Sequence, residues 1–334
     1  MRNREVRGSI PRPGTTLQTS RAPISRLFNQ CPSFSIVMVL MEKRYRVSKA
    51  DVKAVIPKRE AESHKGNFGR LLVVGGGSRY VGAPALVGLA ALRSGVDLAV
   101  IAAPERTAWT INTISPDLIT VKLRCQDLEP SALPDVSSEL ESSTAVVIGP
   151  GLGSLPKTLE AVISLARLLR KEHPELPALF DADAFKALGR APELLKDMPW
   201  VMTPHAGEFK ILTGYDLPAD LQGRAEMASR AARELGCVIL LKGHVDIIAS
   251  ADGALKLNYT GNPGMTVGGT GDVLSGIVGA FLSQRASPFQ AAAAGAWVCG
   301  RAGDLCLGEK GYEFVASDVI DKIPEVFKEV RGKG

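Results

Sequence analysis

The segment Asn262–Leu282, NPGMTVGGTGDVLSGIVGAFL, carries the strongest chemical signal in the chain. Its four small residues Gly268-Gly269-Thr270-Gly271 lead directly into an apolar, helix-like run. The first amide groups of such a helix are free and stand at the positive end of the helix dipole, so they form a site for a phosphate. Asp272 follows at once. The pattern therefore predicts an anion-binding turn with a carboxylate beside it.

Asp272 has two interpretations. A carboxylate in the first turn of a helix is commonly a cap or a stabilising charge. Beside a bound phosphate, the same carboxylate can accept the proton of an attacking hydroxyl group, which phosphoryl transfer requires. We favour the catalytic interpretation.

Polar residues also follow three other apolar runs. In TPHAGEF, Glu208 could approach a magnesium ion through water and His205 could donate to a substrate, although Glu208 could equally be a helix cap. In LLKGH, Lys242 could meet a phosphate or be a solvated strand end. In DADAF, Asp181 and Asp183 could orient a hydroxyl group or a hydrated metal. Each of these signals is weak alone.

Two glycine loops, GGGSRYVGA (Gly75–Ala83) and GPGLG (Gly149–Gly153), each follow an apolar run. The first fails the dinucleotide pattern G-x-G-x-x-G because four residues separate Gly77 from Gly82. It also fails the P-loop pattern, since Gly82 is followed by alanine. Both loops remain open to two interpretations: a tight turn from strand to helix, or a backbone that closes on a ligand.

All these residues border short apolar runs that alternate with helix-like segments. Unbroken apolar strands flanked by helices are typical of a parallel sheet that is buried on both faces. We therefore expect an α/β fold with a doubly wound, mostly parallel sheet sandwiched between helices, with ligands at the carboxyl ends of the strands. The expected strands cover residues 71–74, 97–102, 145–149, 178–183, 200–203 and 238–243, and the expected helices cover 85–93, 155–170 and 273–281.

Charge and composition exclude several classes of protein. The chain has 334 residues, and residues 1–40 hold six of its 40 basic side chains and one of its 35 acidic ones, so the remainder sums to zero (34 against 34). A neutral body does not support a nucleic-acid-binding face, and no apolar run approaches the roughly 18 residues that span a bilayer. Five cysteines without C-x-x-C spacing favour a reducing compartment and argue against zinc. We expect a soluble, cytoplasmic protein without nucleic-acid or membrane partners.

Residues 1–40 do not have the pattern of a folded segment. They are either a targeting segment or the product of a start codon assigned too far upstream, with Met41 as the natural start. We favour the second interpretation because there is no small-residue cleavage signal, and because Met41 precedes a helix pattern with Ser48 as its cap and Asp51 in its first turn. We expect residues 1–40 to be a disordered leader and residues 41–334 to form a single domain.

Taken in order, the motifs resemble the ribokinase-like superfamily, whose G-x-G-D signature matches Gly269–Asp272. Within it they resemble the ADP- or ATP-dependent NAD(P)H-hydrate dehydratase family. His205 stands where sugar kinases of the superfamily often carry the Asn of an N-x-x-E motif, which favours the dehydratases. The resemblance spans about Ser63 to Gly300 and is carried by HKGNFGRLLVVGGG, GAPALVGLAALRSG, GPGLG, DADAF, TPHAGEF, LLKGH and NPGMTVGGTGDVLSGI.

The resemblance implies a lyase that repairs a damaged cofactor. It would dehydrate the S-form of NAD(P)H hydrate (NADHX or NADPHX) to NAD(P)H while converting ADP to AMP, or ATP to ADP, and phosphate. Asp272 would take the proton of the 6-hydroxyl group, a magnesium ion associated with Glu208 would neutralise charge, and K⁺ is a further candidate cofactor. The implied contacts are Ala83, Gly153, His205 and Asp272 for the hydrate, and Lys242, Gly243, His244, Val245, Asp246, Gly268, Gly269, Thr270 and Gly271 for the nucleotide.

Several alternatives stay open at this point. Many members of the family carry a fused epimerase domain, and residues 1–62 are too short for one, so the resemblance implies a separate epimerase chain. The small-residue segment Gln290–Gly300 could pack within the fold or at the interface of an expected homo-oligomer. The alternative function is a small-alcohol kinase of the same fold, similar to hydroxyethylthiazole kinase. A nicotinamide-dependent oxidoreductase is disfavoured by the broken glycine spacing, and a non-enzymatic nucleotide sensor would not need Asp272.

Overall fold

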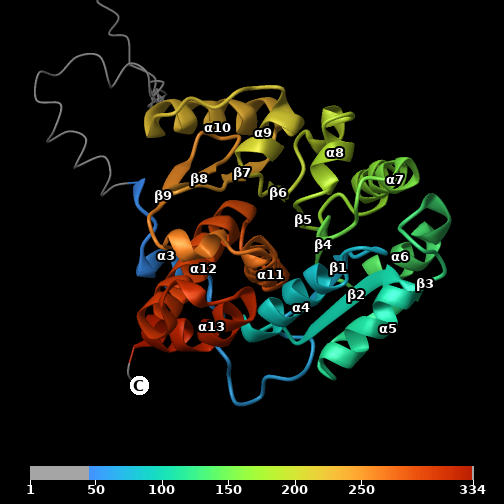
Figure 1. The fold of residues 1–334 in the computed structure, drawn as a ribbon, viewed down its shortest axis with the longest axis horizontal. Helices are drawn as coiled ribbons and strands as arrows, with labels where there is room; N and C mark the ends of the chain where they lie inside the picture. The colour runs from blue at the N-terminus through green and yellow to red at the C-terminus, as the bar shows by residue number, and fades with distance from the viewer. Residues whose placement is uncertain (1–44, 333–334) are drawn as a thin grey trace, which may run out of the picture. The chain divides into compact units, whose positions relative to one another are not determined.

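The computed structural model describes residues 45–332, which wind around one nine-stranded sheet (Figure 1). The strand order is β3-β2-β1-β4-β5-β6-β7-β8-β9, in which β1 to β7 are parallel and the last two pairings are antiparallel. The prediction made for residues 1–40 lies outside the described residues. The strands are β1 (Arg70–Val74), β2 (Leu98–Pro104), β3 (Ile119–Leu123), β4 (Ala145–Ile148), β5 (Ala178–Phe180), β6 (Trp200–Met202), β7 (Val238–Leu241), β8 (Asp246–Ala249) and β9 (Leu255–Asn258).

Helices cover both faces of this sheet. Within residues 45–332, none of them is both long enough and apolar enough to cross a membrane. The α-helices are α3 (Lys49–Val55), α4 (Gly82–Arg93), α5 (Glu105–Ile114), α6 (Leu133–Leu140), α7 (Pro156–Glu172), α8 (Ala184–Leu188), α9 (Ala206–Thr213), α10 (Leu221–Leu235), α11 (Thr270–Ser283), α12 (Pro288–Lys310) and α13 (Ala316–Arg331). The short 3₁₀ helices are η1 (Pro130–Ala132), η2 (Pro192–Leu195), η3 (Pro263–Thr266) and η4 (Gly311–Glu313).

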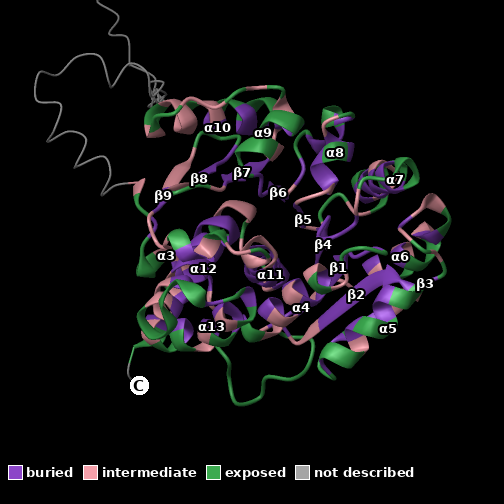
Figure 2. Cartoon of the chain, in the orientation of Figure 1, coloured by how far each residue is buried: buried purple, intermediate pink, exposed green. Residues whose placement is uncertain are grey.

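The core has two layers because successive side chains of a strand point to opposite faces. In β1, Leu71 and Val73 join the cluster under α4, α11, α12 and α13, while Leu72 and Val74 join the cluster under α6, α7, α8 and α10. Figure 2 shows most of the sheet buried, with partly buried residues at its edges, and exposed residues on the outward faces of the helices. Burial on both faces is the reason why the strands read as unbroken apolar runs, and it confirms the predicted doubly wound architecture.

The predicted element boundaries need several corrections. The predicted strands over residues 178–183 and 238–243 run too far, since β5 and β7 end before the loops that hold Asp181 and Lys242. Strands β3, β8 and β9 were not predicted. Polar residues such as Lys122 and Lys256 interrupt the runs of β3 and β9, and the apolar run of β8 after Asp246 is very short. The predicted cap of α3 is confirmed: the backbone N–H and the hydroxyl group of Ser48 both donate to Asp51.

Glycines bring α11 into direct contact with its neighbours. A Cβ atom added to Gly276 would lie 2.3 Å from the carbonyl oxygen of Val87 in α4, and one added to Gly279 would lie 2.7 Å from Val147 Cγ2 in β4. The small-residue segment in α12 packs in the same way, with Gly295 against Val278. Close packing inside the fold therefore accounts for that segment. The close packing of α11 through Gly276 and Gly279 also fixes the N-terminus of this helix relative to the ends of the strands.

We predict opposite effects for one substitution at two helical glycines. Gly276→Ala should lower the free energy of unfolding by about 1–3 kcal/mol, because its methyl group meets the backbone of α4. Gly308→Ala, in the exposed last turns of α12 where an added Cβ meets nothing within 4 Å, should raise it by about 0.5–1 kcal/mol. Urea unfolding measures both. Equal effects at the two positions would contradict the close contact of α11 with α4.

Candidate active site

The sheet has a topological switch point between β1 and β4, since the chain runs outward from β1 through β2 to β3 and then returns to the other side of β1. Ligands bind in the crevice at such points. The two glycine loops follow these two strands and contact each other: the N–H of Gly76 donates to the carbonyl oxygen of Pro150 at 2.8 Å. A Cβ on Gly75 would also meet Pro150, whereas one on Gly82 or Gly153 would meet nothing within 4 Å. Gly75 and Gly76 therefore fit the interpretation as a tight turn. Only at Gly82 and Gly153, of the four glycines compared, is there open space that a ligand could fill.

The turn before α11 has the geometry of an anion site. Gly269 precedes the helix with φ +97°, a conformation that favours glycine, and no side chain caps the first turn. The hydroxyl group of Thr270 donates to the carbonyl oxygens of Met265 (2.8 Å) and Val267 (3.1 Å), which holds the turn in shape. Gly268 borders open space. The amide groups of this turn are therefore available to a phosphate.

Asp272 does not act as a cap. Within residues 45–332 its half-buried carboxylate accepts no hydrogen bond, from the backbone or from a side chain. Burial, with a smaller contribution from the charge of Asp181, raises its pKa to about 7, while the charge of Lys242 opposes the rise. A carboxyl group that titrates near neutrality is suited to act as a general base.

Lys242 lies in a pocket of carboxylates, not at a solvated strand end. Its ammonium group is 2.9 Å from Asp181 Oδ1 and 3.7 Å from Glu208 Oε2, and its side chain is 20% exposed. Burial disfavours the charged ammonium, but these two carboxylates outweigh that effect and raise its pKa above the usual range. A Cβ built on Gly271 would lie 3.6 Å from Lys242 Nζ. The cation therefore stands beside the α11 turn.

The two carboxylates of the loop after β5 serve different halves of the site. Asp181 is almost fully buried, and its second oxygen accepts a hydrogen bond from the Ser275 hydroxyl group in α11 at 2.8 Å. Ala182 then adopts φ +52°, which is uncommon for a residue other than glycine. Asp183 accepts a hydrogen bond from the N–H of Gly153 at 2.9 Å and pairs with Lys186. The loop thus connects Lys242 and α11 on one side with the second glycine loop on the other.

His205 and Glu208 form a capping box at the start of α9. The N–H groups of Gly207 and Glu208 donate to His205 Nδ1, so the neutral ring carries its proton on Nε2. This nitrogen lies 3.5 Å from Glu208 Oε1, in a side chain that is 60% exposed. Glu208 Oε2 accepts from the backbone N–H of His205 at 2.8 Å. The cap alternative for Glu208 is therefore realised, and the same carboxylate also faces Lys242.

The site could hold magnesium only together with bound phosphates and water, and not by protein side chains alone. No group of three or more His, Cys, Asp or Glu side chains among the described residues is arranged to hold a metal ion. Magnesium usually keeps several waters and needs just one or two carboxylates together with substrate phosphates. Asp181 and Glu208, whose oxygens converge on one ammonium group, meet that requirement.

The residues from Lys242 to Asp246 have different surroundings. Asp246 turns into the fold, where it accepts hydrogen bonds from the N–H of Gly243 and from Asn258 Nδ2, both at 3.0 Å. Burial raises its pKa to about 6 against those hydrogen bonds. His244 is exposed and Val245 is half-buried. The side chain of Lys242 alone in this segment reaches the carboxylates, and Asp246 shapes the turn between β7 and β8.

Ser275 is the residue that the sequence analysis missed. It is fully buried and bonded to Asp181. The available signal was a hydroxyl side chain on the buried face of an apolar helix, three residues after Asp272. Ala83 lies in the first turn of α4, with its Cβ beside Gly151 of the second glycine loop, and its contact with a substrate stays a prediction.

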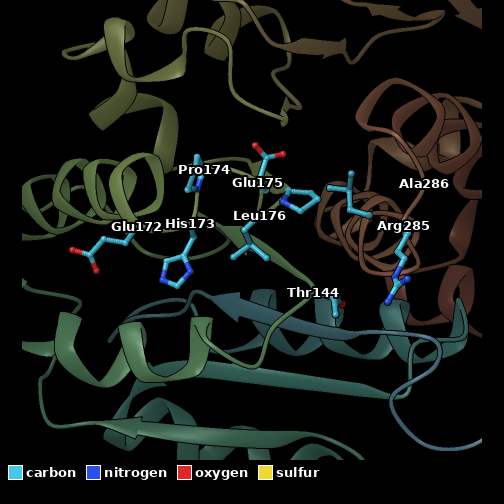
Figure 3. Close-up of a pocket in the computed structure, with 10 residues that line it drawn as sticks. Thr144, Glu172, His173, Pro174, Glu175, Leu176, Arg285 and Ala286 are labelled. Atoms are coloured by element: carbon cyan, nitrogen blue, oxygen red, sulfur yellow. The ribbon is translucent and has the colours of Figure 1, made fainter.

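A wide cavity lies elsewhere in the described part of the chain. It measures about 660 Å³ and is lined at the opposite ends of the strands, where Thr144 precedes β4 and Pro177 precedes β5. Figure 3 shows His173 and Arg285 on either side of Leu176 in this cavity. None of its lining residues belongs to the cluster around Lys242. The candidate active site is thus identified by its chemical groups and not by cavity size.

Comparison with known proteins agrees with this geometry. Residues 71–325 match the family model described as NAD(P)H-hydrate dehydratase. The chain is 47% identical over 273 residues to the bifunctional NAD(P)H-hydrate repair enzyme Nnr of Pyrobaculum aerophilum, covering 81% of this chain and 52% of that protein. It thus spans about half the length of that relative. It is 39% identical over 286 residues to the ADP-dependent (S)-NAD(P)H-hydrate dehydratase of Cenarchaeum symbiosum, covering 84% of this chain and 96% of that one.

A solved structure gives the same result. The ADP/ATP-dependent NAD(P)H-hydrate dehydratase of Bacillus subtilis, co-crystallised with ATP and Mg²⁺, superposes with a TM-score of 0.70 at 30% identity, covering 85% of this chain and 98% of that chain. The predicted ribokinase-like fold class is thereby confirmed. A family model that covers most of the chain and relatives of this similarity lead to one conclusion: the chain belongs to the NAD(P)H-hydrate dehydratase family.

Proposed function

We propose that this chain dehydrates the S-form of NAD(P)H hydrate to NAD(P)H, with an adenine nucleotide as phosphoryl donor. The observation that carries the proposal is Asp272, a carboxylate with no hydrogen-bond partner among the described residues and a pKa raised to about 7, directly beside the uncapped amides of α11. The names of the Cenarchaeum and Bacillus relatives support the substrate and the donor.

The first step of the proposed reaction transfers a phosphoryl group. Asp272 accepts the proton of the 6-hydroxyl group as that oxygen bonds to the terminal phosphorus of the nucleotide. The bond from this phosphorus to the bridging oxygen breaks, which releases AMP from ADP or ADP from ATP. The amides of Gly268 to Gly271 stabilise the negative charge of the phosphoryl group while it is transferred.

The second step is an elimination. Phosphate leaves from carbon 6 with the electrons of the carbon–oxygen bond, assisted by the lone pair of the ring nitrogen. Loss of a proton from the neighbouring ring carbon then restores the double bond of the dihydropyridine. In this proposal His205, Ala83 and Gly153 hold the hydrated ring. The exposure of His205 and the open space at Gly153, where an added Cβ would meet nothing within 4 Å, support this assignment.

Charge on the nucleotide is balanced by two groups in this proposal. Lys242 supplies a fixed cation beside the α11 turn. Magnesium would be held through water by Glu208 and Asp181, and when bound it would neutralise phosphate charge. A K⁺ ion, a homo-oligomer, a separate epimerase chain and a cytoplasmic location stay predictions, as do the preferences between ADP and ATP and between NADHX and NADPHX.

The direct test is absorbance at 340 nm after addition of the protein to hydrated NADH with magnesium and ADP, ATP or no nucleotide. We expect the absorbance to rise with at least one nucleotide and to stay flat without. Asp272→Asn should abolish the rise and leave nucleotide affinity within about threefold, since the base is lost and the amides are kept. The matched control is Asp321→Asn, an exposed carboxylate on α13. A stable phosphorylated product in place of NADH would instead establish a small-alcohol kinase.

The pH dependence follows from the titration of Asp272. A general base works as its carboxylate, so kcat/KM should rise with pH and reach half its plateau near pH 7. Asp181→Asn removes a negative neighbour that raises this pKa, so the midpoint should move to lower pH. Initial rates between pH 5 and pH 9 measure the midpoint in both proteins. An unchanged midpoint in a folded Asp181→Asn variant would show that a different group limits the rate.

The same carboxyl group links stability to pH. Because its folded pKa of about 7 exceeds its ordinary value of 3.8, ionisation of Asp272 destabilises the folded chain; the effect is absent below pH 3.8, grows as the pH rises and is complete above 7. We expect Asp272→Asn to gain about 1–2 kcal/mol more in free energy of unfolding at pH 8 than at pH 5, after allowance for solvent screening. Urea unfolding at the two pH values decides this, and an equal gain at both would refute it.

A further inference from the structure

A second, smaller pocket lies at the far ends of the two helices that begin at the candidate active site. Its volume is about 250 Å³, and it includes Arg93 and Ser94 after α4 and Gln284 after α11. Arg59, Lys328 and Arg331 complete a set of four cationic side chains with Arg93, and no Asp or Glu lines the pocket. This is an unusual concentration of one charge sign on a body whose net charge is zero.

The four charges exceed what the neighbouring helices need. Helices α4 and α13 both end here, with Arg93, Lys328 and Arg331 in their last turns. The C-caps of α3 and α11, Ile56 and Gln284, also line the pocket. The carboxyl end of a helix carries about half a negative charge, so the four helix ends balance about two of the four cations. Within residues 45–332, none of the four forms an ion pair. A surplus of about two positive charges is left around the cavity.

Part of this cationic set is already ordered. The Arg59 guanidinium group stacks on the Phe68 ring at 3.8 Å and donates one hydrogen bond to the carbonyl oxygen of Gly95 at 2.6 Å. A guanidinium group has five N–H donors, so others remain for a ligand. Arg331 lies over the Phe327 ring at 5.8 Å. Side chains held in this way lose less conformational entropy when they bind an anion.

We propose that this pocket is a binding site for a compact polyphosphate anion, such as inorganic diphosphate or the phosphate tail of a nucleotide. Its volume lies below the roughly 300–1,000 Å³ typical of sites for drug-sized ligands, so it suits a phosphate group and not a whole dinucleotide. Planar guanidinium groups match the paired oxygens of a phosphate. The site is separate from Lys242 and the α11 turn, and the inference does not depend on the proposed function.

The test is calorimetric titration of inorganic diphosphate into the full chain saturated with ADP, which keeps the candidate active site filled. We expect one diphosphate per chain to bind, with an affinity that falls as salt rises. Arg59→Gln/Arg93→Gln should weaken binding about tenfold or more, because two charged contacts are lost. Lys328→Gln/Arg331→Gln gives a second variant in case loss of the Arg59 stacking disturbs folding. Circular dichroism checks that each variant is folded.

The control removes equal charge elsewhere. Arg167→Gln/Lys171→Gln takes two exposed cations from α7 and should leave diphosphate affinity unchanged. Equal losses in the control and in the pocket variants, or no diphosphate binding to a native chain that holds only one equivalent of ADP, would overturn the proposal. A second equivalent of ADP that binds to the native chain and is lost in the pocket variants would identify a nucleotide tail as the ligand. Binding of diphosphate alone would identify the free anion.

Discussion

The contact of Asp181 with Lys242 and Ser275 is the constraint on which the site depends. It joins the end of β5, the end of β7 and the first turns of α11 through one buried carboxylate. An unpaired charge at this depth would be strongly unfavourable, so the three elements are held in one arrangement. That arrangement sets where the ammonium group stands relative to the amides of the α11 turn.

Two residues near this contact adopt states that are unfavourable for folding. Ala182 adopts a left-handed conformation between two carboxylates that point to different partners, and Asp272 stays near another negative charge without a hydrogen bond from the described residues. Neither feature helps folding. Both are kept by a scaffold in which α11 is pressed against α4 and β4 through glycines. Rigid packing below the crevice is therefore the source of the unusual chemistry within it.

Six of the nine strands and the turn before α11 could be predicted from the sequence, because burial on both faces and a glycine turn before an apolar helix are local patterns. The catalytic role of Asp272 stays a prediction. The sequence could not show that Lys242 is paired, since its partner Asp181 is 61 residues away in the chain. The sequence left two interpretations for Glu208, a helix cap or a residue that holds magnesium. The capping box with His205 confirms the cap, and the magnesium role stays a prediction. The role of the two glycine loops could not be decided from the sequence, because packing of one loop on the other and close approach to a ligand both require glycine.

The position of α11 in the chain has a consequence for biosynthesis. This helix packs against α4, β1 and β4, all of which precede it by more than a hundred residues. While the ribosome makes the intervening segments, the apolar faces that α11 will cover have no native partner. Closing contacts over such sequence distances is slow, and exposed apolar faces favour association between nascent chains. The helix that builds the anion turn thus joins the core late, and α12 and α13 then cover it, so the site and the stable fold arise in the same late stage.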